Sequence, residues 1–417
     1  MSLITDVTRM WLTRSIQPFT FKNEYDEILS YGDCESLGLY VHIPFCEKIC
    51  SFCPYCKVTY SKDACDAYID TLIQEIHMVG AQYQGKKQVT SLYFGGGTPA
   101  LAVDRLGEIV EAIEEHFIIT EGIGLELHPR NVTVEMLTKL KAAGVTKISV
   151  GIQSFQEKYQ SILGRETIDV EQMATALAQV EFETVSMDFI FALPNQTYLD
   201  LKKDIELAFT HGANHVAIYP FIDFTFTSSR VKVMEKKEKR KLLDEITKYC
   251  IEQGYHRDSI WTFSSERHAK YSSMTRDNFL GFGCSATTLL RDQFKINTFS
   301  VEEYCKRIKE QKLPTSLTIR FTTRQRMIYY LFWTAYSTRV DERDFEKFFG
   351  VPLRKMYGFE LWLAKILGFV TEENGVYEMT LKGAFYYHYY ENFYTLAYID
   401  KMWGIMRKQA FPERIEL

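Results

Sequence analysis

The sequence of 417 residues lacks any apolar run near the roughly 20 residues that a membrane-spanning helix needs. Its N-terminus also lacks the basic segment followed by an apolar segment that marks an export signal. We therefore expect a cytoplasmic protein without a membrane span, in a compartment that keeps thiols reduced.

The chain has little net charge. Its 49 Lys and Arg residues face 54 Asp and Glu residues, which gives a formal net charge of −5 and a pI near 6.1. A general binder of nucleic acid or of an anionic membrane surface needs an excess of basic residues. We therefore expect no nucleic-acid partner, and the length suggests two or three domains.

Cysteine is present, but not in the pattern of a disulfide framework. Four of the nine cysteines, Cys46, Cys50, Cys53 and Cys56, fall within eleven residues in YVHIPFCEKICSFCPYC. Disulfide frameworks stabilise short chains with small cores, whereas 46% of this long chain is hydrophobic. A zinc site is a possibility but ranks second, because zinc usually takes two ligand pairs and no second His/Cys pair follows closely here. Closely spaced thiolates favour an iron–sulfur cube, and three ligands would leave one iron open.

From Gly38 onward, short β-branched or aromatic runs alternate with amphipathic stretches, which is typical of repeated β-α units. The expected strands are GLYVHI, VTSLYF, IGLEL, KISVGI, VSMDFIFAL and HVAIYPF. The expected helical stretches are 61–84, 101–116, 132–143, 156–180 and 198–211. Six such strands predict a parallel sheet, as an open doubly wound sheet or a partial barrel, with functional groups at the carboxyl ends of the strands.

The two ends of the chain differ from this pattern. Residues 1–38 show no strong period and are expected to form an N-terminal arm. Residues 313–417 are rich in Tyr and Phe, and the Asn374–Gly375 pair predicts a hairpin after three helices. This order is typical of a winged-helix-like module, which we expect to pack against the rest of the protein rather than to bind DNA.

Several polar residues follow the predicted strands. GGGTP at 95–99 follows VTSLYF, and glycine lets a backbone come close to a ligand and expose its N–H groups. Glu126 lies near the end of an apolar strand, while Asp188 lies inside one and should need a polar partner. Gln153 ends the fourth strand, and Arg165 could grip a carboxylate with its guanidinium.

These motifs, in this order, resemble the radical S-adenosylmethionine (radical SAM) superfamily, in its oxygen-independent coproporphyrinogen III oxidase branch. The resemblance implies a partial (β/α)6 barrel with an extension at 39–312, followed by the C-terminal module. It implies a [4Fe-4S] cluster on Cys46, Cys50 and Cys53, with Cys56 left over. It also implies one or two molecules of S-adenosyl-L-methionine, held by Tyr40, Phe52, Gly96, Gly97, Thr98, Glu126, Gln153, Arg165 and Asp188.

The mechanism implied by the resemblance is reduction of the cluster, cleavage of S-adenosylmethionine and abstraction of a substrate hydrogen by a 5′-deoxyadenosyl radical. The expected electron donor is a flavodoxin or a ferredoxin. The expected substrate is a tetrapyrrole, as in oxidative decarboxylation of coproporphyrinogen III. Two alternatives within the branch are radical methylation of haem or another ring, and haem binding by a chaperone without turnover.

Overall fold

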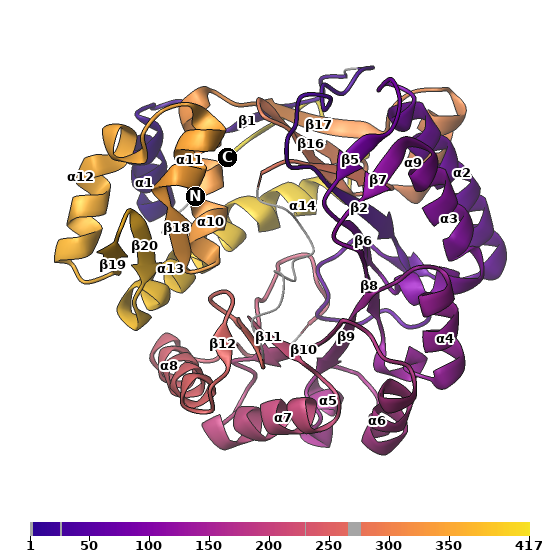
Figure 1. The fold of residues 1–417 in the computed structure, drawn as a ribbon, viewed down its shortest axis with the longest axis horizontal. Helices are drawn as coiled ribbons and strands as arrows, with labels where there is room; N and C mark the ends of the chain where they lie inside the picture. The colour runs from indigo at the N-terminus through magenta and orange to yellow at the C-terminus, as the bar shows by residue number, and fades with distance from the viewer. Residues whose placement is uncertain (1–2, 26, 230, 266–276) are drawn as a thin grey trace.

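A 14-stranded sheet organises the computed structural model, which describes residues 3–25, 27–229, 231–265 and 277–417 (Figure 1). Its strand order is β12-β13-β11-β10-β9-β8-β6-β2-β14-β15-β16-β17-β1-β21. Six neighbouring strands are parallel: β2 (Gly38–Ile43), β6 (Leu92–Gly96), β8 (Ile123–Leu127), β9 (Lys147–Gln153), β10 (Thr184–Phe191) and β11 (His215–Pro220). The predicted parallel sheet is confirmed, and its carboxyl ends share one edge.

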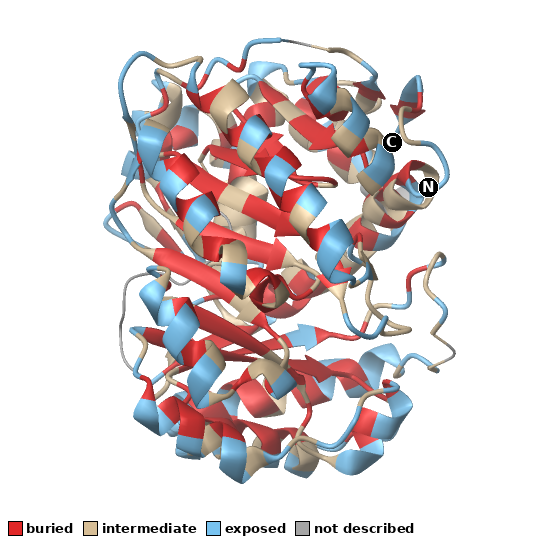
Figure 2. Ribbon diagram, turned by 90° about the vertical axis from the view of Figure 1, so that its right-hand side faces the viewer, coloured by how far each residue is buried: buried red, intermediate tan, exposed pale blue. Residues whose placement is uncertain are grey.

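Helices connect these strands and cover the outside of the curved sheet (Figure 1). They are α2 (Lys62–Gly80), α3 (Val103–His116), α4 (Val134–Ala142), α5 (Glu157–Ile162), α6 (Val170–Gln179) and α7 (Tyr198–Thr210). Their outer faces are exposed and the strands behind them are buried (Figure 2). This alternation gives the partial (β/α)6 barrel that the sequence predicted.

The helical stretch predicted at 156–180 is wrong as a single element, because it consists of α5 and α6. Gly164 has a φ of 66° and follows the end of α5. The Asp169 side chain accepts a hydrogen bond from the Gln172 N–H and caps α6. A left-handed glycine and a new N-cap thus interrupt an apolar pattern that continues across both helices.

A second group of strands extends the sheet beyond β2. β14 (Phe279–Phe282) pairs parallel with β2, and β15 (Thr287–Leu289), β16 (Gln293–Asn297) and β17 (Thr315–Arg320) follow in antiparallel order. A Cβ atom at Gly281 would lie 2.1 Å from the Thr287 carbonyl oxygen, so the backbones approach closely there. β12 (His256–Arg257) and β13 (Thr262–Ser264) extend the opposite edge, next to α8 (Lys236–Glu252).

The N-terminal segment is more regular than its sequence indicated. It forms α1 (Leu3–Thr13) and β1 (Thr20–Lys22), and β1 pairs with β17 and with β21 (Arg414–Glu416). α1 packs against α10 (Thr323–Tyr336) and α13 (Leu381–Tyr394). Both ends of the chain therefore meet at the same edge of the sheet.

The C-terminal region contains the expected winged-helix arrangement. After α10 come β18 (Arg339–Asp341), α11 (Glu342–Phe349), α12 (Leu353–Ile366), β19 (Val370–Glu373) and β20 (Val376–Met379). The β19–β20 turn has positive φ at both Asn374 and Gly375, as a tight hairpin requires. α13 and α14 (Asp400–Met406) then return along the barrel. The division into 1–38, 39–312 and 313–417 stays a prediction. The 14-stranded sheet crosses the expected boundary at 312, because it includes β17 up to Arg320.

Helix α12 does not pack against the barrel as expected. Phe359, Trp362 and Ile366 on this helix are 53%, 54% and 62% exposed. The module contacts the rest of the chain mainly through α10 and α13, and Glu360 of α12 pairs with Arg14 of the N-terminal segment. Within the part of the chain that the structure describes, no helix combines the length and apolar character needed to span a membrane.

Candidate active site

A polar cleft lies at the carboxyl ends of the parallel strands. This cavity of about 550 Å³ is lined by Cys46, Cys50, Phe52, Cys53, Gly96, Gly97, Thr98, Glu126, Gln153, Arg165 and Asp188, among other residues. The structure therefore brings together all the predicted site residues except Tyr40. The three cysteines are free and partly exposed, and the Thr98 hydroxyl lies 3.7 Å from the Cys46 sulfur. Three thiols on one cavity wall are a suitable donor set for an iron–sulfur cluster.

The glycine loop after β6 packs tightly under this cleft. A Cβ atom at Gly97 would lie 2.6 Å from the Phe45 carbonyl oxygen, so a side chain does not fit. The N–H groups of Gly96, Gly97 and Thr98 donate to Glu126, Ile43 and Phe45. Each of these three N–H groups therefore has an acceptor within the protein, and the assignment of Gly96, Gly97 and Thr98 to a ligand stays a prediction.

Two carboxyl groups, Glu126 on β8 and Asp188 on β10, line the cleft from the two strands that flank β9. Glu126 accepts hydrogen bonds from the Gly96 N–H at 3.2 Å and from the Tyr93 hydroxyl at 3.3 Å. Burial, reinforced by the charge of Asp188, raises the pKa of Glu126 to about 7. Glu126 can therefore hold or release a proton near neutral pH.

Asp188 has the polar partners that its position in an apolar strand required. The hydroxyl groups of Ser149 and Ser186 donate to its carboxyl oxygens at 2.8 Å and 3.2 Å. Burial raises the pKa of Asp188 to about 6, and these two hydrogen bonds act in the opposite direction. The sequence analysis missed Ser149 and Ser186, although Ser186 is two residues from Asp188 and faces the same side of β10.

Gln153 and Arg165 meet beside Gly151. Gln153 ends β9 with a φ of 69°, and Arg165 donates from Nη1 to the Gly151 carbonyl. The Nε atom of Arg165 is buried and has no hydrogen-bond partner among the described residues. An unsatisfied guanidinium donor at a cleft wall is suited to an anionic ligand group.

Tyr40 and His42 lie two residues apart on β2, so their side chains share one face of the strand. The Tyr40 hydroxyl is 3.2 Å from His42 Nδ1, and His42 Nε2 is 3.0 Å from the Cys56 carbonyl oxygen. Cys56 is buried, and its thiol donates to the Phe299 carbonyl oxygen at 3.1 Å. The ligand atoms of His42, Cys56 and Cys284 all lie within 4.8 Å of one another. Cys56 thus belongs to a buried cluster apart from the other three cysteines.

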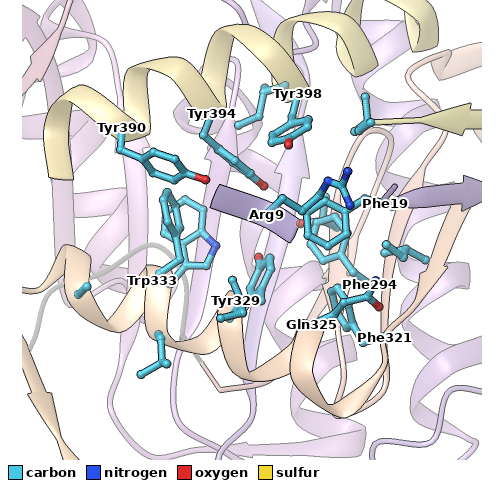
Figure 3. A pocket seen from close by; sticks show the side chains of 18 of the residues that line it. Arg9, Phe19, Phe294, Phe321, Gln325, Tyr329, Trp333, Tyr390, Tyr394 and Tyr398 are labelled. Atoms are coloured by element: carbon cyan, nitrogen blue, oxygen red, sulfur yellow. The ribbon is translucent and has the colours of Figure 1, made fainter. Parts of the chain in front are cut away.

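A second cavity, the aromatic chamber, adjoins the cleft. It has a volume of about 710 Å³ and lies between the sheet, α1, α10 and the segment from α13 to α14. Tyr329 and Trp333 from α10 face Tyr390, Tyr394 and Tyr398 across it (Figure 3). The sequence showed the aromatic richness of this region but not that its rings surround a cavity.

The chamber and the cleft share part of their walls. Tyr55, Gly96, Glu126, Tyr329, Trp333, Ile399 and Trp403 line both cavities. Tyr55 and Trp403 also contact each other, with ring centroids 6.0 Å apart. A ligand in the aromatic chamber would therefore border directly on whatever occupies the polar cleft.

Comparison with known proteins gives a consistent set of similarities. Residues 40–208, which include every predicted site residue, match the radical SAM superfamily. The chain is 25% identical over 335 residues to the heme chaperone HemW of Bacillus subtilis, covering 76% of this chain and 88% of that protein. It is 27% identical over 306 residues to the oxygen-independent coproporphyrinogen III oxidase of Cereibacter sphaeroides, covering 67% of this chain and 68% of that enzyme.

The fold is similar to that of a solved structure, the coproporphyrinogen III oxidase HemN of Escherichia coli. The TM-score is 0.75 at 23% identity, and the match covers 88% of this chain and 93% of that one. The partial barrel and the helical C-terminal region thus have a counterpart of known structure.

Proposed function

Since the chain belongs to the radical SAM superfamily, in the branch of the oxygen-independent coproporphyrinogen III oxidases and the HemW proteins, we propose that it acts on a tetrapyrrole. The cofactors of this superfamily are a [4Fe-4S] cluster and S-adenosylmethionine. When bound, they supply the chemistry of hydrogen-atom abstraction from a substrate carbon. The three thiols and the unsatisfied Arg165 donor of the cleft fit these two groups.

In this proposal, Cys46, Cys50 and Cys53 hold the cluster and leave one iron for S-adenosylmethionine. Arg165 pairs with the carboxylate of the methionyl part, because its side chain lines the cleft and its Nε has no acceptor among the described residues. The methionyl amino group is a donor, so it meets the carbonyl side of the loop at 96–98, whose N–H groups are already engaged.

The remaining cleft residues orient the nucleoside part of the cofactor. Asp188 and Gln153 offer acceptors to the ribose hydroxyls or the adenine, and Phe52 offers a ring for stacking. Tyr40 lies on the chamber side and acts through His42, to which it is hydrogen-bonded. Its role is therefore to position His42 rather than to contact the cofactor.

Glu126 is the group we expect to move a proton. It borders both cavities, and its pKa of about 7 allows either protonation state at neutral pH. A carboxyl group in the wall shared by the cleft and the chamber can take up a proton from the substrate or supply one to it during the reaction.

The observation that carries the tetrapyrrole proposal is the aromatic chamber itself. About 710 Å³ of mostly apolar volume can bury a large flat ring, and the chamber adjoins the cleft at the shared wall residues Tyr55, Glu126 and Trp403. A small polar substrate would leave most of these aromatic walls without a partner. The chamber therefore supports a macrocyclic substrate whose edge reaches the cofactors.

The test is anaerobic incubation with S-adenosylmethionine, a reductant and either coproporphyrinogen III or haem, followed by mass spectrometry. Decarboxylation predicts a product that has lost carbon dioxide. It also predicts that 5′-deoxyadenosine is formed in a fixed ratio to this product. Radical methylation predicts a mass gain of one methyl group, and a chaperone predicts haem binding without 5′-deoxyadenosine. If neither tetrapyrrole binds nor promotes cofactor cleavage, the proposal fails.

We also propose a flavodoxin or a ferredoxin as the electron donor and a reducing cytoplasm as the location. The nine cysteines, all of which are free, support the reducing location. A test is reduction of the reconstituted cluster by purified flavodoxin or ferredoxin, followed by its absorbance.

A further inference from the structure

The aromatic chamber contains one cationic side chain on a wall that is otherwise largely apolar. Arg9 on α1 is the only Arg or Lys among the described residues that line it. Figure 3 shows its side chain on the same side of the cavity as Phe19 and Phe294. Arg9 is only 8% exposed, so its guanidinium has little contact with bulk solvent.

The hydrogen-bonding capacity of Arg9 is not filled by the protein. Nη1 donates to the Gln17 carbonyl, whereas Nε is buried and has no partner among the described residues. A guanidinium has five N–H donors, and an unsatisfied buried donor is unfavourable. The side chain therefore retains donors for a ligand.

No acidic side chain of the described chamber wall neutralises Arg9. Glu360 forms a salt bridge with Arg14 and accepts a hydrogen bond from Trp11. Glu126 lies at the cleft, where its carboxyl is hydrogen-bonded to Gly96 and Tyr93. The charge of Arg9 acts on the chamber residue Tyr390: burial raises the pKa of Tyr390 to about 12, and the positive charge of Arg9 partly lowers it.

We infer that the aromatic chamber is a subsite for a large, flat, carboxylate-bearing ligand, with the ring between the aromatic walls and one carboxylate on Arg9. A guanidinium binds a carboxylate through two parallel hydrogen bonds, and the low-polarity walls strengthen that pairing. The inference deepens the proposed function and rests on it for the natural ligand, a tetrapyrrole with acidic side chains. It assigns the N-terminal helix, which lies outside residues 40–208, a direct part in substrate selection.

The test compares the affinities for an acid and for its ester, because the ratio of these two affinities isolates the contribution of the carboxylate contact. Binding of 1-pyrenebutyric acid and of its methyl ester is measured by fluorescence on the full chain, without any turnover. The chain should bind the acid more tightly than the ester. Arg9→Gln should lower affinity for the acid by about tenfold to a hundredfold and leave the ester nearly unchanged.

Two further variants separate binding from general damage to the fold. Arg414→Gln removes an equal charge from an exposed position on β21 and should keep the preference for the acid. Arg9→Lys keeps the charge without the planar fork and should give an intermediate preference. If the acid-to-ester ratio of Arg9→Gln and of Arg9→Lys equals that of the unchanged chain, the inference is overturned.

The outcome is distinguishable from failure of the proposed function. If the affinity for 1-pyrenebutyric acid depends on Arg9 while protoporphyrin IX does not bind, the carboxylate subsite stands and the tetrapyrrole proposal fails. If protoporphyrin IX and its dimethyl ester bind equally well, and Arg9→Gln changes neither, the proposed function stands and the Arg9 subsite fails.

Discussion

At the scale of single residues, the four clustered cysteines divide into three plus one. We predict that Ala at Cys46, Cys50 or Cys53 removes the absorbance of the cluster, because each thiol lines the cleft. Cys56→Ala should retain an oxygen-sensitive cluster, since Cys56 is buried with His42 and Cys284. Iron and sulfide content after anaerobic reconstitution measures both effects. Loss of iron from Cys56→Ala would contradict this division.

Arg165 offers a second prediction at this scale. Arg165→Ala should weaken binding of S-adenosylmethionine by about 1.5–3 kcal/mol, the range for one hydrogen bond to a charged group. Arg130→Ala is the control, because Arg130 is exposed and pairs with Glu166. Calorimetry on both anaerobic variants measures the affinities, and equal values would show that Arg165 does not bind the cofactor.

Residue chemistry was predictable where a polar side chain interrupts an apolar strand. Glu126 and Asp188 could be identified in this way, because a carboxyl group in such a strand requires partners. Their partners were harder to predict: Ser149 lies on the neighbouring strand, and the register that aligns it is a tertiary property. The direction of the N–H groups at 96–98 likewise depends on how the loop packs against Phe45.

At the scale of elements, the glycine loop after β6 should tolerate no side chain at its tightest point. Gly97→Ala is expected to destabilise the fold by about 2–3 kcal/mol, because the added Cβ meets backbone atoms rather than a movable side chain. Gly107→Ala in α3 is the control, where nothing lies within 4 Å of a new Cβ. That change should stabilise the protein by about 0.5–1 kcal/mol. Denaturant unfolding compares them, and similar effects would contradict the packing argument.

Helix α2 is tied to distant strands through the buried carboxyl of Glu75. It accepts hydrogen bonds from Tyr304 at 2.7 Å, Gly283 at 2.7 Å and Asn297 at 3.3 Å. Burial raises the pKa of Glu75 from 4.5 to about 7, against the effect of these hydrogen bonds. The folded chain therefore binds this proton more tightly than the unfolded chain between those pH values.

The stability contributed by that proton is present below pH 4.5 and is lost as the pH rises to about 7. We predict that the free energy of unfolding of the unchanged chain, minus that of Glu75→Gln, falls by about 2–3 kcal/mol across this pH interval. Glu111→Gln, at an exposed position on α3, should show no such trend. Urea unfolding at several pH values provides the measurement, and a flat difference for Glu75→Gln would refute the prediction.

Element type followed from local pattern, whereas element limits and the N-terminal helix did not. The six barrel strands are continuous apolar runs, so their period and composition indicated them directly. α1 shows no strong period, and its packing against α10 and α13 joins residues more than 300 positions apart. Such contacts can stabilise a short helix whose own sequence is a weak signal.

At the scale of the whole molecule, the cleft and the aromatic chamber have different origins. The predicted site residues of the cleft lie within residues 40–208 on consecutive β-α units, so motif order indicated that part of the wall, whereas later residues such as Trp261, Tyr329 and Trp403 complete it. The chamber forms only when α1, the extended sheet, α10 and the C-terminal helices come together. The sequence therefore indicated the cofactor chemistry, while the aromatic chamber could be recognised only in the assembled fold.

The central claim is that a tetrapyrrole held in the chamber loses a hydrogen atom to chemistry in the adjoining cleft. The most direct measurement is anaerobic turnover of coproporphyrinogen III deuterated on its propionate side chains, with mass analysis of the 5′-deoxyadenosine formed. We predict one deuterium in the 5′-deoxyadenosine, in amounts that follow product. Undeuterated 5′-deoxyadenosine, formed equally with and without the tetrapyrrole, would contradict the claim.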